Sequence, residues 1–124
     1  MAISMRRSVK KETGRKYQQD RKKKKMELAR PMSLTKIGEK KVKKIRTIGG
    51  NIKNRALIYD ELIVLKGKTK TKAKIIRVLE NPSNRHFVRM NVLTKGAIIK
   101  TDKGNVKVTN RPGQEGHIQG IFVK

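Results

Sequence analysis

The chain has 124 residues, with 34 Lys+Arg against 9 Asp+Glu and a formal net charge of +25. A positive excess of this size repels itself, and a polyanion such as a phosphate backbone relieves that repulsion best. The absence of Cys excludes disulfides, thiolate metal sites and Cys nucleophiles. The apolar runs are far shorter than the ~20 residues of a membrane-spanning helix, and residues 1–7 lack the apolar core of a signal peptide. We therefore expect a soluble intracellular protein that binds nucleic acid.

The charge is distributed differently from the apolar residues. Residues 1–36 hold 13 Lys/Arg and 3 acids, a net charge of +10, but only two Val or Ile residues. Residues 54–124 hold 15 Val+Ile. A segment so poor in apolar residues cannot bury enough surface to offset the entropy of ordering it. We predict a basic RNA-binding extension over residues 1–40, disordered when free, followed by an antiparallel β-barrel-like domain over residues 41–124.

Within the extension, residues 16–29 contain good helix formers, and Pro31 ends a helix at or before Arg30. The five successive cations of residues 21–25 oppose that helix in free solution, so we expect a short helix over residues 16–29 only in the bound state. A basic run can also be a solvated tail or a localisation signal. The spread of cations through the whole extension favours nucleic acid. The predicted RNA-binding residues here are Arg6, Arg7, Lys10, Lys11, Arg15, Lys16, Arg21, Lys22, Lys23, Lys24, Lys25 and Arg30.

Turn residues recur at short intervals through the rest of the chain, a spacing typical of a mainly β fold; nine of the ten glycines lie from Gly38 onward. Several short strands in so small a domain favour closure into a small barrel or a two-layer sandwich. The loop Asp102-Lys103-Gly104 predicts a hairpin between residues 97–101 and 105–109, because Gly is frequent late in such loops. The expected strands are 42–48, 56–59 running into 62–65, 73–79, 87–93, 97–100, 106–109 and 117–123.

Lysine occupies every even position from Lys66 to Lys74. Successive side chains of a strand point to opposite faces, so these five lysines are expected to line one face of an extended ribbon around Gly67. The alternative is an exposed hairpin whose lysines only protect a sheet edge from aggregation.

Motifs for catalysis, metal or cofactor binding are missing from the sequence. Gly67-Lys68-Thr69 resembles the end of a phosphate-binding loop, but Leu62 stands where that motif requires Gly. His86 and His117 are too few for a metal site, and the acids show no paired spacing for acid/base chemistry. We therefore expect no enzyme activity, no metal or other cofactor and no small-molecule substrate.

Three segments combine turn residues with Arg, Lys, Asn or Gln, as phosphate and sugar contacts require: residues 49–55, 81–89 and 110–116. Each alone is also compatible with a plain hairpin connection. Because the chain holds only four aromatic residues, we expect binding through backbone and shape, without base stacking. The predicted RNA-binding residues of these segments are Lys53, Arg55, Arg85, Arg89 and Arg111.

The same segments carry a resemblance to a known family. The sequence resembles the small-subunit ribosomal protein family S8e of archaea and eukaryotes, and its length is similar to the short archaeal form. The order and spacing of the matching residues agree over nearly the whole chain. The matching stretches are Lys44-Ile45-Arg46, Gly49-Gly50-Asn51, Arg55-Ala56-Leu57, Asn81-Pro82-Ser83-Asn84-Arg85, Thr94-Lys95-Gly96-Ala97 and Arg111-Pro112-Gly113-Gln114-Glu115-Gly116, with Arg6-Arg7-Ser8, Thr13-Gly14-Arg15 and residues 21–28 in the extension.

The resemblance implies a structural constituent of the small ribosomal subunit, located in cytoplasmic ribosomes. Its expected partners are small-subunit ribosomal RNA and neighbouring ribosomal proteins, with no membrane contact. It also implies a β-barrel-like body with a basic extension in contact with that RNA. Two alternatives remain: a ribosome-assembly factor that leaves before the mature particle forms, and a DNA-packaging protein.

We predict that binding to structured RNA depends steeply on salt. If the cations neutralise ~8 to 10 phosphates, a plot of log affinity against log salt concentration should have a slope of about −6 to −9. Filter binding over a series of salt concentrations measures this slope. A slope near zero would contradict the electrostatic mechanism.

Overall fold

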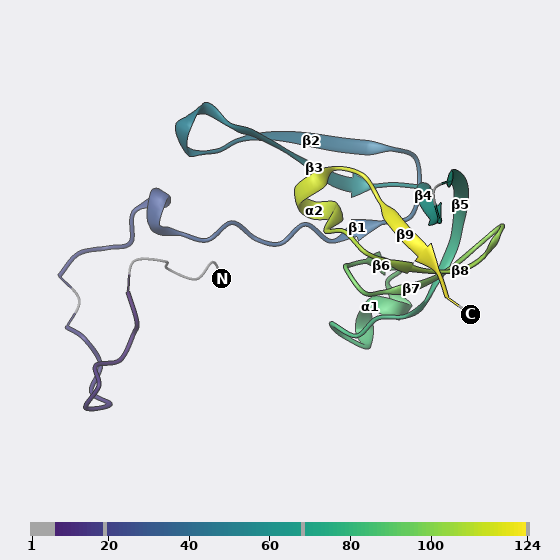
Figure 1. Cartoon of the computed structure of the whole chain (residues 1–124). Coiled ribbons are helices and arrows are strands. Elements are labelled where there is room, and N and C mark those ends of the chain that lie inside the picture. The colour runs from purple at the N-terminus through teal and green to yellow at the C-terminus, as the bar shows by residue number, and fades with distance from the viewer. Residues whose placement is uncertain (1–6, 19, 68, 124) are drawn as a thin grey trace. The chain divides into compact units, whose positions relative to one another are not determined.

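The computed structural model describes residues 7–18, 20–67 and 69–123, so the predictions for Arg6 and Lys68 lie outside the described residues. The chain forms two compact units, Met1–Met32 and Ser33–Lys124 (Figure 1). In the described ranges, no helix is long and apolar enough to cross a membrane. The predicted extension of residues 1–40 thus includes the first strand of the second unit, β1 (Thr35–Lys36).

The first unit contains little regular structure. Lys10 and Lys16 form an antiparallel bridge, and the amide of Tyr17 donates to the carbonyl oxygen of Val9 at 3.2 Å. Among the described residues of the first unit, Lys25–Glu27 form the 3-10 helix η1. The longer helix over residues 16–29 was predicted only for the protein bound to nucleic acid, so it stays a prediction.

The second unit is built on a closed barrel of five strands, which confirms the mainly β, barrel-like fold expected from the sequence. Its neighbouring pairs are antiparallel except β4 with β9, which are parallel. A closed ring with an odd number of strands cannot alternate direction throughout, so at least one parallel pair is required. The strands are β4 (Glu61–Lys66), β5 (Thr69–Glu80), β7 (Ile98–Thr101), β8 (Gly104–Val108) and β9 (Gln119–Phe122).

A second sheet has the strand order β2-β3-β1-β6, formed with β2 (Lys41–Arg46), β3 (Ile52–Ile58) and β6 (Val92–Leu93). The strand β1 pairs in parallel with β3 and antiparallel with β6. The hairpin of β2 and β3 extends past α2 (Pro112–Glu115) and away from the barrel strands (Figure 1). We call this hairpin, residues 41–58, the basic ribbon.

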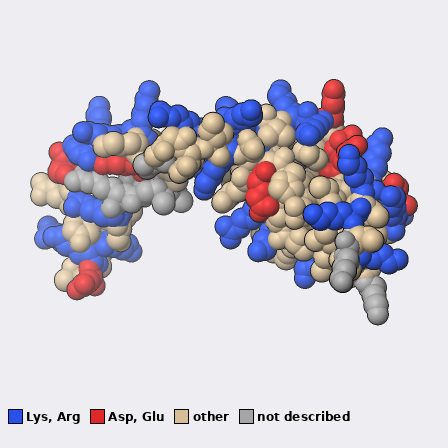
Figure 2. Space-filling model, turned by 45° about the horizontal axis from the view of Figure 1, so that its top comes forward, with Lys and Arg blue, Asp and Glu red and all other residues tan. Residues whose placement is uncertain are grey.

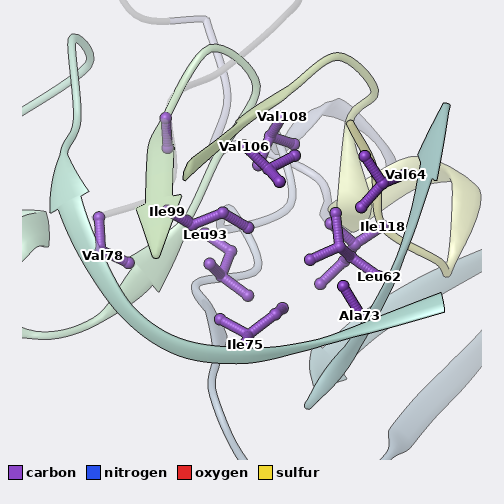
Figure 3. Close-up of a cluster of buried hydrophobic side chains, with 11 residues drawn as sticks. Leu62, Val64, Ala73, Ile75, Val78, Leu93, Ile99, Val106, Val108 and Ile118 are labelled. Atoms are coloured by element: carbon purple, nitrogen blue, oxygen red, sulfur yellow. The ribbon is translucent and has the colours of Figure 1, made fainter. Parts of the chain in front are cut away.

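The core lies inside the barrel. Figure 3 shows apolar side chains from several strands pointing toward one another within the curve of β5. β5 can bend around them because its pairing with β7 shifts register twice, between Ile75 and Arg77 and between Val78 and Glu80. Bulges of this kind increase local twist and let a long strand follow a barrel wall. The buried cluster comprises Leu62, Val64, Ala73, Ile75, Val78, Leu93, Ala97, Ile99, Val106, Val108 and Ile118.

The strand predicted over residues 87–93 is wrong for most of its length, because α1 (His86–Arg89) and β6 replace it. Asn84 starts the helical turn: its side-chain oxygen accepts from the amide of His86 at 2.9 Å. Asn91 ends it in a left-handed conformation, φ 50°, and its side-chain oxygen accepts from the amide of Val78 at 3.2 Å. Local side-chain to backbone bonds therefore override the apolar pattern.

The hairpin predicted between residues 97–101 and 105–109 is confirmed, with Thr101 opposite Gly104. The predicted single face of five lysines is wrong. Lys66 pairs with Thr69 across a tight turn, which puts Lys66 on the face of Val64 and Thr71, whereas Lys70, Lys72 and Lys74 lie on the other face. Side-chain alternation does not continue through a turn, so the period-two pattern is broken at Gly67.

We predict that the barrel core dominates stability. Ile99 is 0% exposed and Ile76 is 55% exposed, although both lie on barrel strands. Ile99→Ala should lower the free energy of unfolding by about 2 to 5 kcal/mol through lost burial and a cavity. The control Ile76→Ala should change it by no more than about 1 kcal/mol. Urea unfolding followed by circular dichroism measures both, and equal losses would contradict the assigned core.

Candidate nucleic-acid interface

The basic ribbon concentrates positive charge on a two-stranded hairpin. Residues 41–58 contain six Lys/Arg and no Asp or Glu. Lys43 lies directly opposite Arg55, a like-charge cross-strand pair, and Ile45 lies opposite Lys53. Like charges in direct opposition destabilise a sheet. The ribbon therefore holds a repulsion that an external polyanion would relieve.

The tip of the ribbon is a turn made by Gly49 and Gly50, both in the left-handed region with φ 78° and 80°. Thr47 closes it, since its amide and its hydroxyl both donate to the carbonyl oxygen of Asn51, at 2.7 and 2.9 Å. The sequence groups residues 49–55 as one segment of turn residues and polar side chains. Residues 52–55 are not part of the turn but belong to β3, because the two glycines turn the chain back early enough for the strand to pair.

The base of the ribbon is held by buried contacts. The hydroxyl of Thr35, itself 1% exposed, donates to the carbonyl oxygen of Ala56 at 2.7 Å. Gly116, the left-handed C-cap of α2, packs so closely on β3 that a Cβ there would lie 2.5 Å from Cβ of Asn54. The ribbon is thus anchored at the base, while its cations towards the tip remain exposed.

A second basic site surrounds α1 and the loop before it. Asn81, 6% exposed, fixes this loop: its side-chain nitrogen donates to the carbonyl oxygen of Val92 at 3.1 Å. Its side-chain oxygen accepts from the amide of Ser83 at 3.0 Å and from the hydroxyl of Thr94 at 2.9 Å. The rigid loop presents the exposed residues Arg85 and Arg89 at opposite ends of α1.

The third predicted segment, residues 110–116, forms the short helix α2 with Pro112 at its start and is therefore not a plain hairpin connection. A Pro at the first helical position has the φ that a helix requires, which explains the difference. Asn110 ties the segment to β9 by accepting from the amide of Gln119 at 2.9 Å, and its side-chain nitrogen donates to Glu115 of α2 at 3.1 Å. Arg111 is exposed at the N-cap.

Several cations of the extension have partners within the first unit. The guanidinium of Arg7 lies 4.4 Å from the ring centroid of Tyr17, and Lys11 lies 5.5 Å from the same ring. Arg21 forms an ion pair with Glu27, and this hydrogen bond raises the pKa of Arg21 above its ordinary value. Arg21 therefore stays charged, as arginine does at all physiological pH values. The residues Lys10, Arg15, Lys16, Lys22, Lys23, Lys24, Lys25 and Arg30 are exposed.

The barrel surface also carries cations, but acids accompany them. Lys74 lies opposite Glu61, and its amide donates to Asp102 at 3.0 Å. Arg77 lies opposite Lys100 further along β5. Figure 2 shows Lys and Arg atoms spread over the visible face of this unit, with acidic atoms in small groups. In the described ranges, no group of three or more His, Cys, Asp or Glu residues is arranged to hold a metal ion.

The structure brings Lys53 and Arg55 together on one ribbon face and groups Arg85 with Arg89, whereas Arg111 is the N-cap of α2, the helix that packs against β3. The sequence prediction missed the cations of β2, which share the ribbon: Lys41, Lys43, Lys44 and Arg46. Residues 42–48 were predicted as a strand, but its pairing partner was not predicted. These cations could be grouped with Lys53 and Arg55 only once residues 42–48 were paired with residues 52–58. The double glycine between the two segments could have indicated this pairing.

The chain is similar to a known protein family over nearly its whole length. A family model described as Ribosomal protein S8e matches residues 4–123. The chain is 51% identical over 118 residues to the small ribosomal subunit protein eS8 of Nanoarchaeum equitans, covering 90% of each chain. It is 41% identical to that of Methanobrevibacter smithii, covering 99% of this chain and 100% of the relative. For Staphylothermus marinus the identity is 42%, covering 94% and 93%.

We predict that Asn81 is needed to hold the loop that carries Arg85. Asn81→Ala removes three hydrogen bonds and leaves buried polar groups unpaired, so it should lower the free energy of unfolding by about 1 to 3 kcal/mol. The exposed Asn105 provides the matched control, and Asn105→Ala should leave stability within about 0.5 kcal/mol. Urea unfolding measures both. Equal stability of the two variants would contradict the role of Asn81.

Proposed function

The chain belongs to the ribosomal protein S8e family, and from this we propose that it is a structural constituent of the small ribosomal subunit that binds and stabilises folded ribosomal RNA through phosphate contacts. The proposal assigns it no catalytic step. Its partners are small-subunit ribosomal RNA and neighbouring ribosomal proteins, and its location is the cytoplasmic ribosome. The three relatives share the name small ribosomal subunit protein, which supports this assignment.

The basic ribbon is the observation that carries the proposal. Its six Lys/Arg residues lie in a segment with no acid, and Lys43 and Arg55 are held opposite each other on paired strands. The backbone pairing keeps these two like charges close, an arrangement that destabilises a sheet. Dense phosphate would neutralise these charges, so that relief of their repulsion would favour binding. The contacts would fix the position of the protein on the RNA without reading the base sequence.

The extension and the loops supply further phosphate contacts. The run of residues 21–25 gives a high local charge, and Arg85, Arg89 and Arg111 are exposed on short elements of the second unit. Scarcity of aromatic residues supports recognition by backbone and shape, because stacking on bases requires exposed rings.

Two other functions would give different binding behaviour. An assembly factor would use the same basic surfaces but leave before the subunit matures. A DNA-packaging protein would bind duplex DNA as strongly as structured RNA. Competition distinguishes the latter: small-subunit ribosomal RNA should displace duplex DNA strongly, and equal affinity for both would favour packaging.

We predict stable residence in mature small subunits. Lysate of cells that make this protein is sedimented through a sucrose gradient at physiological salt and again at high salt, and the fractions are probed for the chain. The protein should sediment with mature small subunits at physiological salt, because many phosphate contacts act together. Its presence only in immature particles or among free proteins would overturn the proposal.

A further inference from the structure

The cations of the basic ribbon are divided between its two faces. Cross-strand partners share a face, so Lys43 lies with Arg55, and the neighbouring pair Ile45 and Lys53 lies on the same side. The opposite face carries Lys44. Arg46, with Ile52 as its cross-strand partner, lies on this second face as well. We call the first set face one and the second set face two.

A flat contact with one RNA backbone would use only one of these faces. The other face would then leave its exposed lysines, either Lys43 and Lys53 or Lys44, without phosphate contacts, although residues 41–58 contain no acid. We propose that the basic ribbon binds between two separate RNA backbone segments, with one segment against each face. This inference rests on the proposed function and specifies the kind of RNA structure that the ribbon recognises.

The size of the ribbon excludes the major groove of a single regular RNA duplex. β2 has six residues, which span about 20 Å, and side chains on both faces make a β layer about 10 Å thick. The major groove of A-form RNA is deep and too narrow for such an element. The minor groove is shallow, so it can contact only one face of the ribbon. The two segments therefore belong to two neighbouring helices or to the arms of a junction.

The anchoring of the ribbon suits insertion of this kind. At its base α2 and β1 hold β3, so the strands do not have to be ordered when RNA binds. At the tip Ile52 is 65% exposed beside Arg46. An apolar side chain at the leading end of a basic element can contact sugars or unstacked bases where two segments meet.

Lys43 and Lys44 provide a matched test, since they are adjacent, both exposed and on opposite faces. Lys43→Gln and Lys44→Gln should each lower the magnitude of the log–log salt slope by about 0.7 to 0.9, and the double variant by about 1.4 to 1.8. The slopes are measured by filter binding of the full chain to a small-subunit ribosomal RNA transcript. An effect of only one substitution would overturn the inference, because a ribbon lying on one backbone uses one face.

A second measurement locates the two segments. The chain has no native cysteine, so Lys43→Cys and Lys44→Cys each offer one attachment point for an iron–EDTA group that cleaves nearby RNA backbone. The two probes should cut different nucleotides, distant from each other in the RNA sequence. Identical cuts from both probes would overturn the inference. The exposed Asn105, placed on the barrel strand β8, gives the control Asn105→Cys, whose cuts should match neither set.

The outcomes separate this inference from the proposed function. If the unaltered chain shows no saturable binding to small-subunit ribosomal RNA, the proposed function fails and the inference fails with it. If the chain binds but only one face contributes, the proposed function stands and the inference alone is wrong. Both substitutions lie at exposed positions, so we expect the fold to be unchanged. Circular dichroism of each variant checks this.

Discussion

The pairing of β9 with β4 closes the five-strand barrel, and the basic surfaces of the second unit depend on that closure. Ile63 lies opposite Gln119 and Val64 opposite Gly120, which seals the core on its last side. Inside the ring the apolar side chains are shielded from water, so burial can offset the repulsion among cations outside it. The loops, α2 and the ribbon base are then attached to a rigid support.

Acidic residues accompany the cations of the second unit in some segments and not in others. Around β5, acids such as Glu61 and Asp102 lie beside the lysines and moderate their repulsion. The basic ribbon has no acid in its sequence, and its register opposes like charges. A surface meant only to keep the protein soluble would be expected to mix both signs. The basic ribbon therefore differs from such a mixed surface, in agreement with the proposed phosphate partner.

Composition and turn spacing were enough to predict the mainly β fold and the hairpin at Gly104, but they left a barrel and a two-layer sandwich open, and the resemblance to the S8e family implied the barrel. They were not enough where side chains bond to the backbone: Asn84 and Asn91 build a helical turn inside an apolar run that looks like a strand. For the candidate site, exposed cations could be named but not grouped. Strand register and turn length decide which cations share a face. Side-chain alternation alone placed Lys66 on the same face as Lys70, Lys72 and Lys74, whereas the structure has it on the opposite face.

The sequence separation of the closing strands has a consequence for synthesis. The strands of the basic ribbon are near neighbours in the chain, but the barrel cannot close until residues 119–122 have been made and can reach β4. Closure of so long a loop is slow compared with hairpin formation. The strongly cationic segments therefore leave the ribosome before the core that supports them exists. During that interval the nascent chain presents its cations to any nearby polyanion before the barrel has folded.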